Sequence, residues 1–172
     1  MTSWGEVEAE RFMPLPCDRL LPAADLVVHR AVDVAAPAEL TFRWLCQLRV
    51  APYSYDLLDN RGRRSPRTLT PGLDRLAVGQ RVARIFRLAD FAAGEHLTVE
   101  LDDPQAARLF GRVAGTWHVS PRGVRSSRLL VRLRIAGLDR VRRRGLAYGD
   151  LIMMRKQLRT LAALAERDAR AA

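Results

Sequence analysis

A single amphipathic segment, residues 149–168, closes this chain and constrains its fold more than any other feature. Its apolar residues recur at spacings of three and four, which places them on one face of a helix of about five turns. These residues are Leu151, Met154, Leu158, Leu161 and Ala165. Asp150 suits the N-cap. No other segment predicts a helix of this length, so this one has to cover the apolar face of whatever the rest of the chain builds.

Strands dominate the chain before that helix. Alternation of apolar and polar residues predicts one strand at 24–36 and four more at 80–91, 96–102, 107–121 and 125–137. The strand at 107–121 places Leu109, Val113, Trp117 and Val119 on one side. The last strand places Leu129, Val131, Leu133 and Ile135 on one side and Arg128, Arg132 and Arg134 on the other. Short connections indicate hairpins, and hence an antiparallel sheet with one solvent-exposed face.

Three further segments complete the organisation. Residues 37–48 predict a short amphipathic helix, with Pro37 at its first position and Leu40, Trp44 and Leu48 on one face. Residues 49–78 are rich in proline and glycine and predict a long loop with at most one helical turn; loops of this length are usually functional or disordered. Residues 1–23 show no period. We therefore expect an irregular arm at 1–23, one domain at 24–168 and a tail at 169–172.

Composition excludes several classes of protein. A chain of 172 residues that is 48% hydrophobic fits one domain with a substantial core. It has no apolar run long enough for a membrane span and no signal-like start, so we expect a cytoplasmic protein. Cys17 and Cys46 form no metal pattern, and phosphate-loop, HExxH and GxSxG motifs are absent. We expect no cofactor, no metal and no nucleophile-based chemistry.

Positive charge raises the question of an anionic partner. The net charge is +10, of which residues 61–172 carry +14 and residues 1–60 carry −4. The stretch 125–144 could bind a nucleic acid or a membrane surface through its arginines. The alternative is a genome that favours arginine codons, because only Lys156 among the basic residues is a lysine. Aromatic residues are not interleaved on the basic face, which argues against specific recognition of RNA.

The order of elements indicates an α+β fold in which a curved antiparallel sheet wraps around one long C-terminal helix. Such shapes often hold a ligand cavity where sheet and helix diverge. The stretch VDVAAPAELTFRWLCQL, residues 32–48, resembles the opening of the START-related, polyketide cyclase/dehydrase-like helix-grip superfamily (SRPBCC), although Phe42 stands where many relatives carry tryptophan. Residues 51–66, 78–82 and 149–166 resemble an uncharacterised, mainly actinobacterial branch of it. The resemblance covers most of residues 24–168.

This resemblance implies the helix-grip fold but no single activity, because the superfamily holds lipid carriers, hormone and allergen-type binders, aromatase/cyclases and chaperone activators. Tyr53 and Tyr55 lie two apart in the loop, so both rings point to one side of an extended segment. They either face a cavity or pack the loop onto the sheet. Asp56 is a weak candidate for a general base, and more often such a residue closes a turn. Four arginines of the same loop either clamp an anionic group or neutralise nearby carboxylates: Arg61, Arg63, Arg64 and Arg67.

Arg84 interrupts the apolar phase of its predicted strand, and Arg30 does the same in the first strand. A buried unpaired guanidinium is costly, so Arg84 has a partner, lines a wet cavity, or shows that the strand phase is wrong. Met153 and Met154 either line the cavity with adaptable surface or belong to the core. The candidate ligand-binding residues are Tyr53, Tyr55, Arg84, Phe86, Trp117, Met153 and Met154, and the weak catalytic candidates are Tyr55 and Asp56.

Three functions follow from these observations. The first is a protein, monomeric or homodimeric, that binds a small hydrophobic or aromatic molecule in an internal cavity. The second is an enzyme similar to polyketide cyclases and dehydratases, which would use polar cavity residues for acid–base steps. The third is a basic module that binds an anionic partner.

Overall fold

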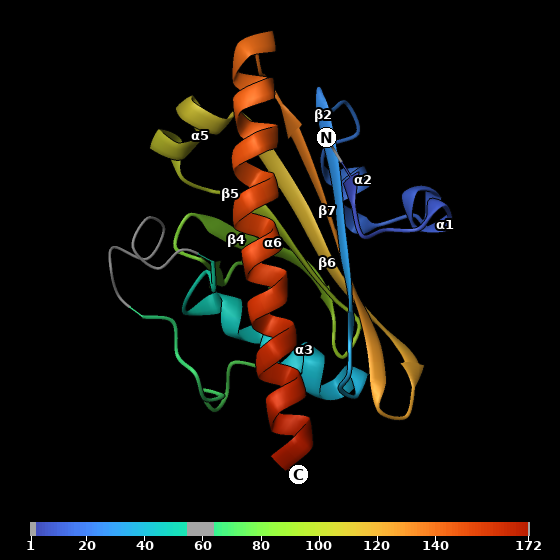
Figure 1. Cartoon of the computed structure of the whole chain (residues 1–172). Coiled ribbons are helices and arrows are strands. Elements are labelled where there is room, and N and C mark those ends of the chain that lie inside the picture. The colour runs from blue at the N-terminus through green and yellow to red at the C-terminus, as the bar shows by residue number, and fades with distance from the viewer. Residues whose placement is uncertain (1–2, 55–63, 172) are drawn as a thin grey trace.

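The computed structural model describes residues 3–54 and 64–171, with the backbone alone described for residues 140–152. Within these ranges one sheet forms the centre of the molecule and the long helix α6 lies across it (Figure 1). The sheet order is β1-β2-β7-β6-β5-β4-β3, and every pair is antiparallel except β1 with β2. The strands are β1 Ser3–Trp4, β2 Leu26–Val34, β3 Arg81–Val82, β4 Phe86–Ala92, β5 His96–Leu101, β6 Arg112–Gly123 and β7 Ser126–Ala136. The helices are α1 Glu8–Phe12, α2 Pro16–Leu20, α3 Ala38–Cys46, the 3₁₀ helix η1 Gln47–Arg49, α5 Pro104–Phe110 and α6 Arg140–Ala171.

The inner face of the sheet, the one toward α6, carries the main core. Met154, Leu158, Leu161 and Ala165 of α6 are buried in one cluster with the inward-facing set of β7: Leu129, Val131, Leu133 and Ile135. α6 also contacts β2 and α3. The predicted helix-grip fold, with one amphipathic helix covering the apolar face of an antiparallel sheet, is therefore confirmed.

The prediction that Asp150 caps the start of this helix was wrong, because α6 begins at Arg140. α6 continues through Gly145 and Gly149, since one glycine costs only about 1 kcal/mol relative to alanine inside a helix. The arginines between residues 140 and 144 are good helix formers, which favours continuation through both glycines.

Two predicted strands were wrong in part. The strand expected at 80–91 is a hairpin, because β3 pairs back onto β4 with Val82 opposite Phe86. The turn between them places Ala83 and Arg84 at φ angles of 44° and 71°. The first part of the strand expected at 107–121 is instead α5: Asp103 caps it by accepting a hydrogen bond from the Ala106 N–H at 2.7 Å. Leu109 consequently lies on a helix and not on the inner face of β6.

The outer face of the sheet is covered by the N-terminal arm, so the expectation of a solvent-exposed face was wrong. The arm contains α1 and α2, and its residues Leu15, Cys17 and Leu21 form a second buried cluster with Ala31, Ala114 and Leu130 of the sheet. Figure 1 shows α1 and α2 on the side of the sheet away from α6. Each helix has only five residues, which is too short for an apolar period to be visible in the sequence.

Arginines of β7 hold the arm in place. Arg128 donates to the Glu10 carboxylate at 2.8 and 2.9 Å, and Arg134 donates to Asp18 at 3.0 Å. Arg132 bonds Asp18 and also donates to three backbone carbonyls of residues 10, 11 and 13 at 2.8–2.9 Å. Arg128 and Arg132 are thereby only 6% and 3% exposed. The alternation of β7 correctly predicted that these arginines lie on the outer face of the sheet. They contact the N-terminal arm there instead of being exposed to solvent.

Membrane spans are not a feature of the part of the chain that the structure describes. No helix there combines the length and the apolar character that crossing a bilayer requires.

Candidate functional site

Three of the predicted ligand-binding residues come together beneath α6. Tyr53, Trp117 and Met154 are buried in the main core cluster, and Phe86 is half-buried against it. They come from the segment after η1, from β6, from α6 and from β4. Tyr53 has a φ angle of 55°, and its ring meets the Trp44 ring edge-on with the centroids 6.2 Å apart. The aromatic and thioether side chains expected around a ligand therefore share one region of the interior.

A buried amide links the elements of this region. Gln157 of α6 accepts a hydrogen bond from the Trp117 indole N–H at 3.0 Å and donates to the Pro52 carbonyl at 2.7 Å. One side chain thus joins the sheet, the helix and the segment that carries Tyr53. Sequence reasoning missed Gln157, although a polar residue beside Met154, Leu158 and Leu161 on an apolar helix face was a usable signal.

Gly115 makes room for Trp117 on the inner face of β6. A Cβ at Gly115 would lie 2.3 Å from the Leu133 side chain and 3.2 Å from the Trp117 ring. Glycine inside a strand often marks such a close approach. The missing side chain at position 115 therefore lets these two large neighbours pack over the strand backbone.

The remaining candidates lie elsewhere. Arg84 is exposed in the β3–β4 turn, which means that the strand phase that placed it in the interior was wrong. Met153 is 37% exposed, unlike its buried neighbour Met154. Tyr55 and Asp56 fall outside the described residues, as do Arg61 and Arg63 of the arginine-rich loop. Arg64 and Arg67 are exposed.

Arg30 is the one charged side chain of β2 that lies on the inner face. It is fully buried, in phase with Val28 and Val34, and its Nη1 donates to the His29 carbonyl at 2.8 Å. Opposite it in the sheet lies Val131 of β7. The break in the apolar alternation of residues 24–36 therefore corresponds to a buried arginine side chain.

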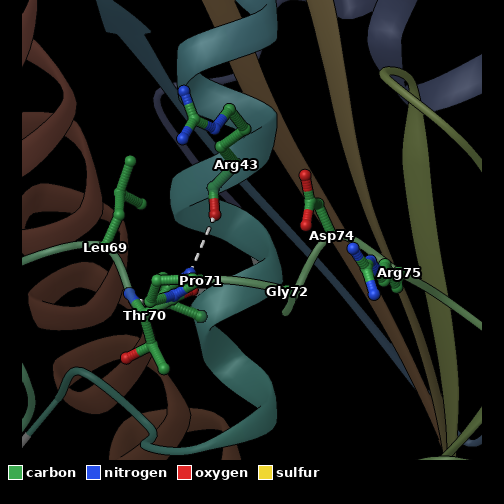
Figure 2. A pocket seen from close by; sticks show the side chains of 8 residues that line it. Arg43, Leu69, Thr70, Pro71, Gly72, Asp74 and Arg75 are labelled. Atoms are coloured by element: carbon green, nitrogen blue, oxygen red, sulfur yellow. Dashed lines mark hydrogen bonds between the residues drawn. The ribbon is translucent and has the colours of Figure 1, made fainter.

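An open pocket of about 400 Å³ lies beside α3 (Figure 2). Gln47 fixes its wall: the side chain accepts from the Thr70 N–H at 2.9 Å and donates to the Thr70 and Arg43 carbonyls at 3.3 and 3.5 Å. Figure 2 shows the side chains of Arg43, Asp74 and Arg75 around the opening. Two guanidinium groups and a carboxylate suit a polar molecule, so this pocket is not a counterpart of the predicted apolar cavity.

A second pocket, of about 440 Å³, lies between β2 and α6. Trp4 contributes to its wall, and the guanidinium groups of Arg155 and Arg159 lie over the Trp4 ring at 5.1 and 5.4 Å from its centroid. Glu166, also in the wall, accepts a hydrogen bond from the Ala35 N–H at 3.0 Å. The arginine contacts attach β1 to α6, and the Glu166 contact attaches the end of β2 to α6.

Burial shifts the pKa values of both cysteines and of two histidines. Burial raises the pKa of the Cys46 thiol to about 12 and also raises the pKa of Cys17, so both thiols are protonated near neutral pH. Burial lowers the pKa of His29 and of His118, which keeps both imidazoles neutral. Across residues 3–54 and 64–171, no group of three or more histidine, cysteine, aspartate or glutamate side chains is arranged to hold a metal ion.

Solved structures with the same fold have low sequence identity to this chain. The di-domain ARO/CYC BexL from the BE-7585A biosynthetic pathway matches with a TM-score of 0.54 and 13% identity, over 81% of this chain and 46% of BexL. MLL2253 from Mesorhizobium loti matches with a TM-score of 0.53 and 15% identity, over 82% of this chain and 97% of that protein. CV1439 from Chromobacterium violaceum matches with a TM-score of 0.52 and 15% identity, over 81% and 97%.

No family model matches this chain, and no curated protein matches it in sequence. This chain spans less than half the length of BexL. At identities of 13–15% these likenesses show the fold alone. They confirm the fold expected from the SRPBCC resemblance, whereas the actinobacterial branch stays a prediction.

Proposed function

We propose that the protein binds a small hydrophobic or aromatic molecule between the inner face of the sheet and α6. The observation that carries this proposal is the convergence of Tyr53, Trp117 and Met154 in one region under α6. Aromatic rings offer flat apolar surface, and a methionine adapts its shape to a ligand at small cost. Ligand sites are typically lined by such side chains with a few fixed polar groups.

Gln157 is the polar group that would orient the ligand. Its amide is buried and held from both sides, by the Trp117 N–H and the Pro52 carbonyl. A primary amide has two N–H donors and an oxygen that accepts twice, so a ligand group could bond Gln157 while both present bonds remain. An apolar molecule with a single carbonyl or hydroxyl group therefore fits this region better than a purely aliphatic one.

The test is ligand capture by two variants at neighbouring positions. Met154→Trp places a large side chain in the buried region, whereas Met153→Trp places the same side chain at the more exposed neighbour. The wild-type protein should release a small apolar molecule on denaturation, detected by native mass spectrometry and solvent extraction. Met154→Trp should lose that molecule and Met153→Trp should retain it, with thermal unfolding showing that both variants fold.

Two results would count against binding under α6. The first is a wild-type protein that carries no molecule and binds no fluorescent apolar probe. The second is a probe that binds equally well to both variants when both are folded. Either result would indicate that the region around Trp117 is solid core and nothing more.

A second candidate function is an enzyme of the cyclase or dehydratase kind. It is favoured by the shared fold with BexL, which is named as an ARO/CYC protein. The residues that would transfer protons are Tyr55 and Asp56. Unchanged turnover of a polyketide-like substrate in Tyr55→Phe and Asp56→Asn would remove these assignments, and a substrate bound without any turnover would leave the binding function alone.

A further inference from the structure

The open pocket beside α3 carries three charged side chains that the proposed function does not use. Arg43 comes from α3 itself, and Asp74 and Arg75 come from the segment that runs beside this helix. All three are exposed, whereas Gln47, which also lines the pocket, is buried. Figure 2 shows Asp74 between the two arginines in that view. We call Arg43, Asp74 and Arg75 the pocket charges.

The pocket charges are not neutralised by the protein. In the part of the chain that the structure describes, none of the three side chains makes an ion pair or a hydrogen bond, with each other or with any other residue. Exposed arginines elsewhere do find a carboxylate, as Arg87 does with Glu100 at 2.6 Å. Opposite charges that line one pocket without contacting each other can all bind a single ligand.

The wall that carries two of these charges is fixed before any ligand binds. Gln47 holds the backbone of Thr70 through both its N–H and its carbonyl group. Arg49 and Gln80 each donate to the Arg75 carbonyl at 3.2 Å. These bonds fix the backbone and leave the side chains of the wall available. A wall that is already ordered loses little conformational entropy when a ligand binds.

The composition of the pocket charges defines the chemistry of a matching ligand. A guanidinium group binds a carboxylate through two parallel hydrogen bonds. The Asp74 carboxylate accepts hydrogen bonds from a cationic donor such as an ammonium group. The complement of two guanidinium groups and one carboxylate is therefore a molecule with two carboxylates and one ammonium group. The volume of about 400 Å³ is that of a small-molecule site.

From these contacts we propose that the pocket beside α3 binds an acidic amino acid. Arg43 and Arg75 each bind one carboxylate of the ligand, and Asp74 binds its ammonium group. The pocket shares no residue with the region under α6 that surrounds Trp117. The inference consequently does not rest on the proposed function, and either one can fail alone.

An acidic amino acid fits this pocket better than a simple dianion does. A dicarboxylate without an amine would occupy both arginines, but it would leave Asp74 beside a second negative charge. Like charges brought together at a binding site disfavour the wrong ligand. A dicarboxylate is therefore the alternative that the experiment has to separate.

The experiment is calorimetric titration of the full chain at low salt with three ligands that differ by one charged group. L-glutamate carries all three groups, glutarate lacks the ammonium group, and γ-aminobutyrate lacks one carboxylate. The variants are Arg43→Gln, Arg75→Gln and Asp74→Asn, with thermal unfolding as the check on folding.

The matched controls are Arg112→Gln and Glu8→Gln. Both residues are exposed, and neither lines a pocket described above. Each control removes the same kind of charge as a pocket variant and changes the net charge of the chain by the same amount. A general effect of net charge on anion binding would therefore appear in the controls as well.

The wild-type protein should bind L-glutamate about tenfold more tightly than either of the other ligands, because each lacks one charged hydrogen-bonding group. Arg43→Gln and Arg75→Gln should each weaken L-glutamate binding by about tenfold for the same reason. Asp74→Asn should weaken L-glutamate binding to the level of glutarate and should not weaken glutarate binding. Both controls should bind like the wild type.

Three results would overturn the proposal. The first is a folded wild-type protein that binds none of the three ligands at millimolar concentration. The second is glutarate bound as tightly as L-glutamate, which would make the pocket a site for simple dianions. The third is a loss of affinity in Arg112→Gln as large as in Arg43→Gln, which would show attraction to the overall positive charge and no defined site.

Discussion

Replacing Arg132 with alanine should loosen the N-terminal arm from the sheet. The Arg132 side chain is 4% exposed, bonds the Asp18 carboxylate and donates to three backbone carbonyls of the arm. Removing one partner of a buried ion pair costs about 3–5 kcal/mol, because the other groups stay buried without compensation. Asp18 keeps its hydrogen bond to Arg134 and is partly exposed, so we expect a loss near the lower limit, about 3 kcal/mol.

The assay is urea unfolding of the full chain, read as the free energy of unfolding, together with limited proteolysis of the arm. Arg87→Ala is the matched control. Arg87 also lies on a strand and contacts the Glu100 carboxylate at 2.6 Å, but it is exposed, and an exposed pair contributes about 0–1 kcal/mol. The burial argument would be refuted if Arg132→Ala lowered the free energy no more than Arg87→Ala does.

Three further predictions concern the interior and the titratable groups. Gln157→Leu should lower the free energy of unfolding by about 2–3 kcal/mol, because the Trp117 N–H and the Pro52 carbonyl lose a buried partner; an unchanged midpoint in urea would contradict this. Hydrogen bonds from Arg128 hold the pKa of Glu10 below its ordinary 4.5, so this carboxylate stabilises the fold above that pH and its contribution is lost as the pH falls through the lowered pKa. Acid unfolding should therefore begin below about pH 4.5, with a shallower pH dependence in Glu10→Gln. Since burial raises the pKa of Cys46 to about 12, iodoacetamide should modify neither cysteine until urea unfolds the chain; rapid alkylation of the native protein would show that the sites open.

The sequence predicted the architecture because two periodic patterns were strong. The spacing of Met154, Leu158 and Leu161 indicated one apolar helix face, and the alternation of Leu129 with Arg128 indicated the two faces of β7. Both patterns show which side of a single helix or strand is buried, and this can be read from neighbouring residues in the sequence. Helix-on-sheet packing followed from them without knowledge of any contact.

The parts that could not be predicted depend on contacts between distant segments. The arm is held largely by side chains of β7 that donate hydrogen bonds to backbone carbonyls more than 100 positions away. Every residue has a backbone carbonyl, so the sequence does not indicate which of them accept such bonds. The β3–β4 turn was hidden because Ala83 and Arg84 adopt positive φ angles without a glycine. By contrast, α5 could have been found, since Asp103, Pro104 and Gly111 are ordinary start and stop signals of a helix.

The candidate site was predicted only in outline. Trp117 and Met154 were expected in the interior because each is in phase with the apolar residues of its strand or helix, whereas Tyr53 was named only for its spacing from Tyr55 in the loop. Arg84 was misplaced because residues 80–91 were treated as one continuous strand, whereas the chain turns back at Arg84 between β3 and β4. Gln157 was missed because its role depends on two partners, Trp117 and Pro52, that only the folded chain brings within reach.

Two acidic residues of the arm, Glu10 and Asp18, each make two kinds of contact. Glu10 accepts the Val7 N–H at the start of α1 while it binds Arg128, and Asp18 accepts the Leu15 N–H at the start of α2 while it binds Arg134. Helices of five residues do not persist alone in water. We therefore expect α1 and α2 to form only while the arm is attached to the sheet, and detachment of the arm would expose Leu130 and its neighbours to solvent.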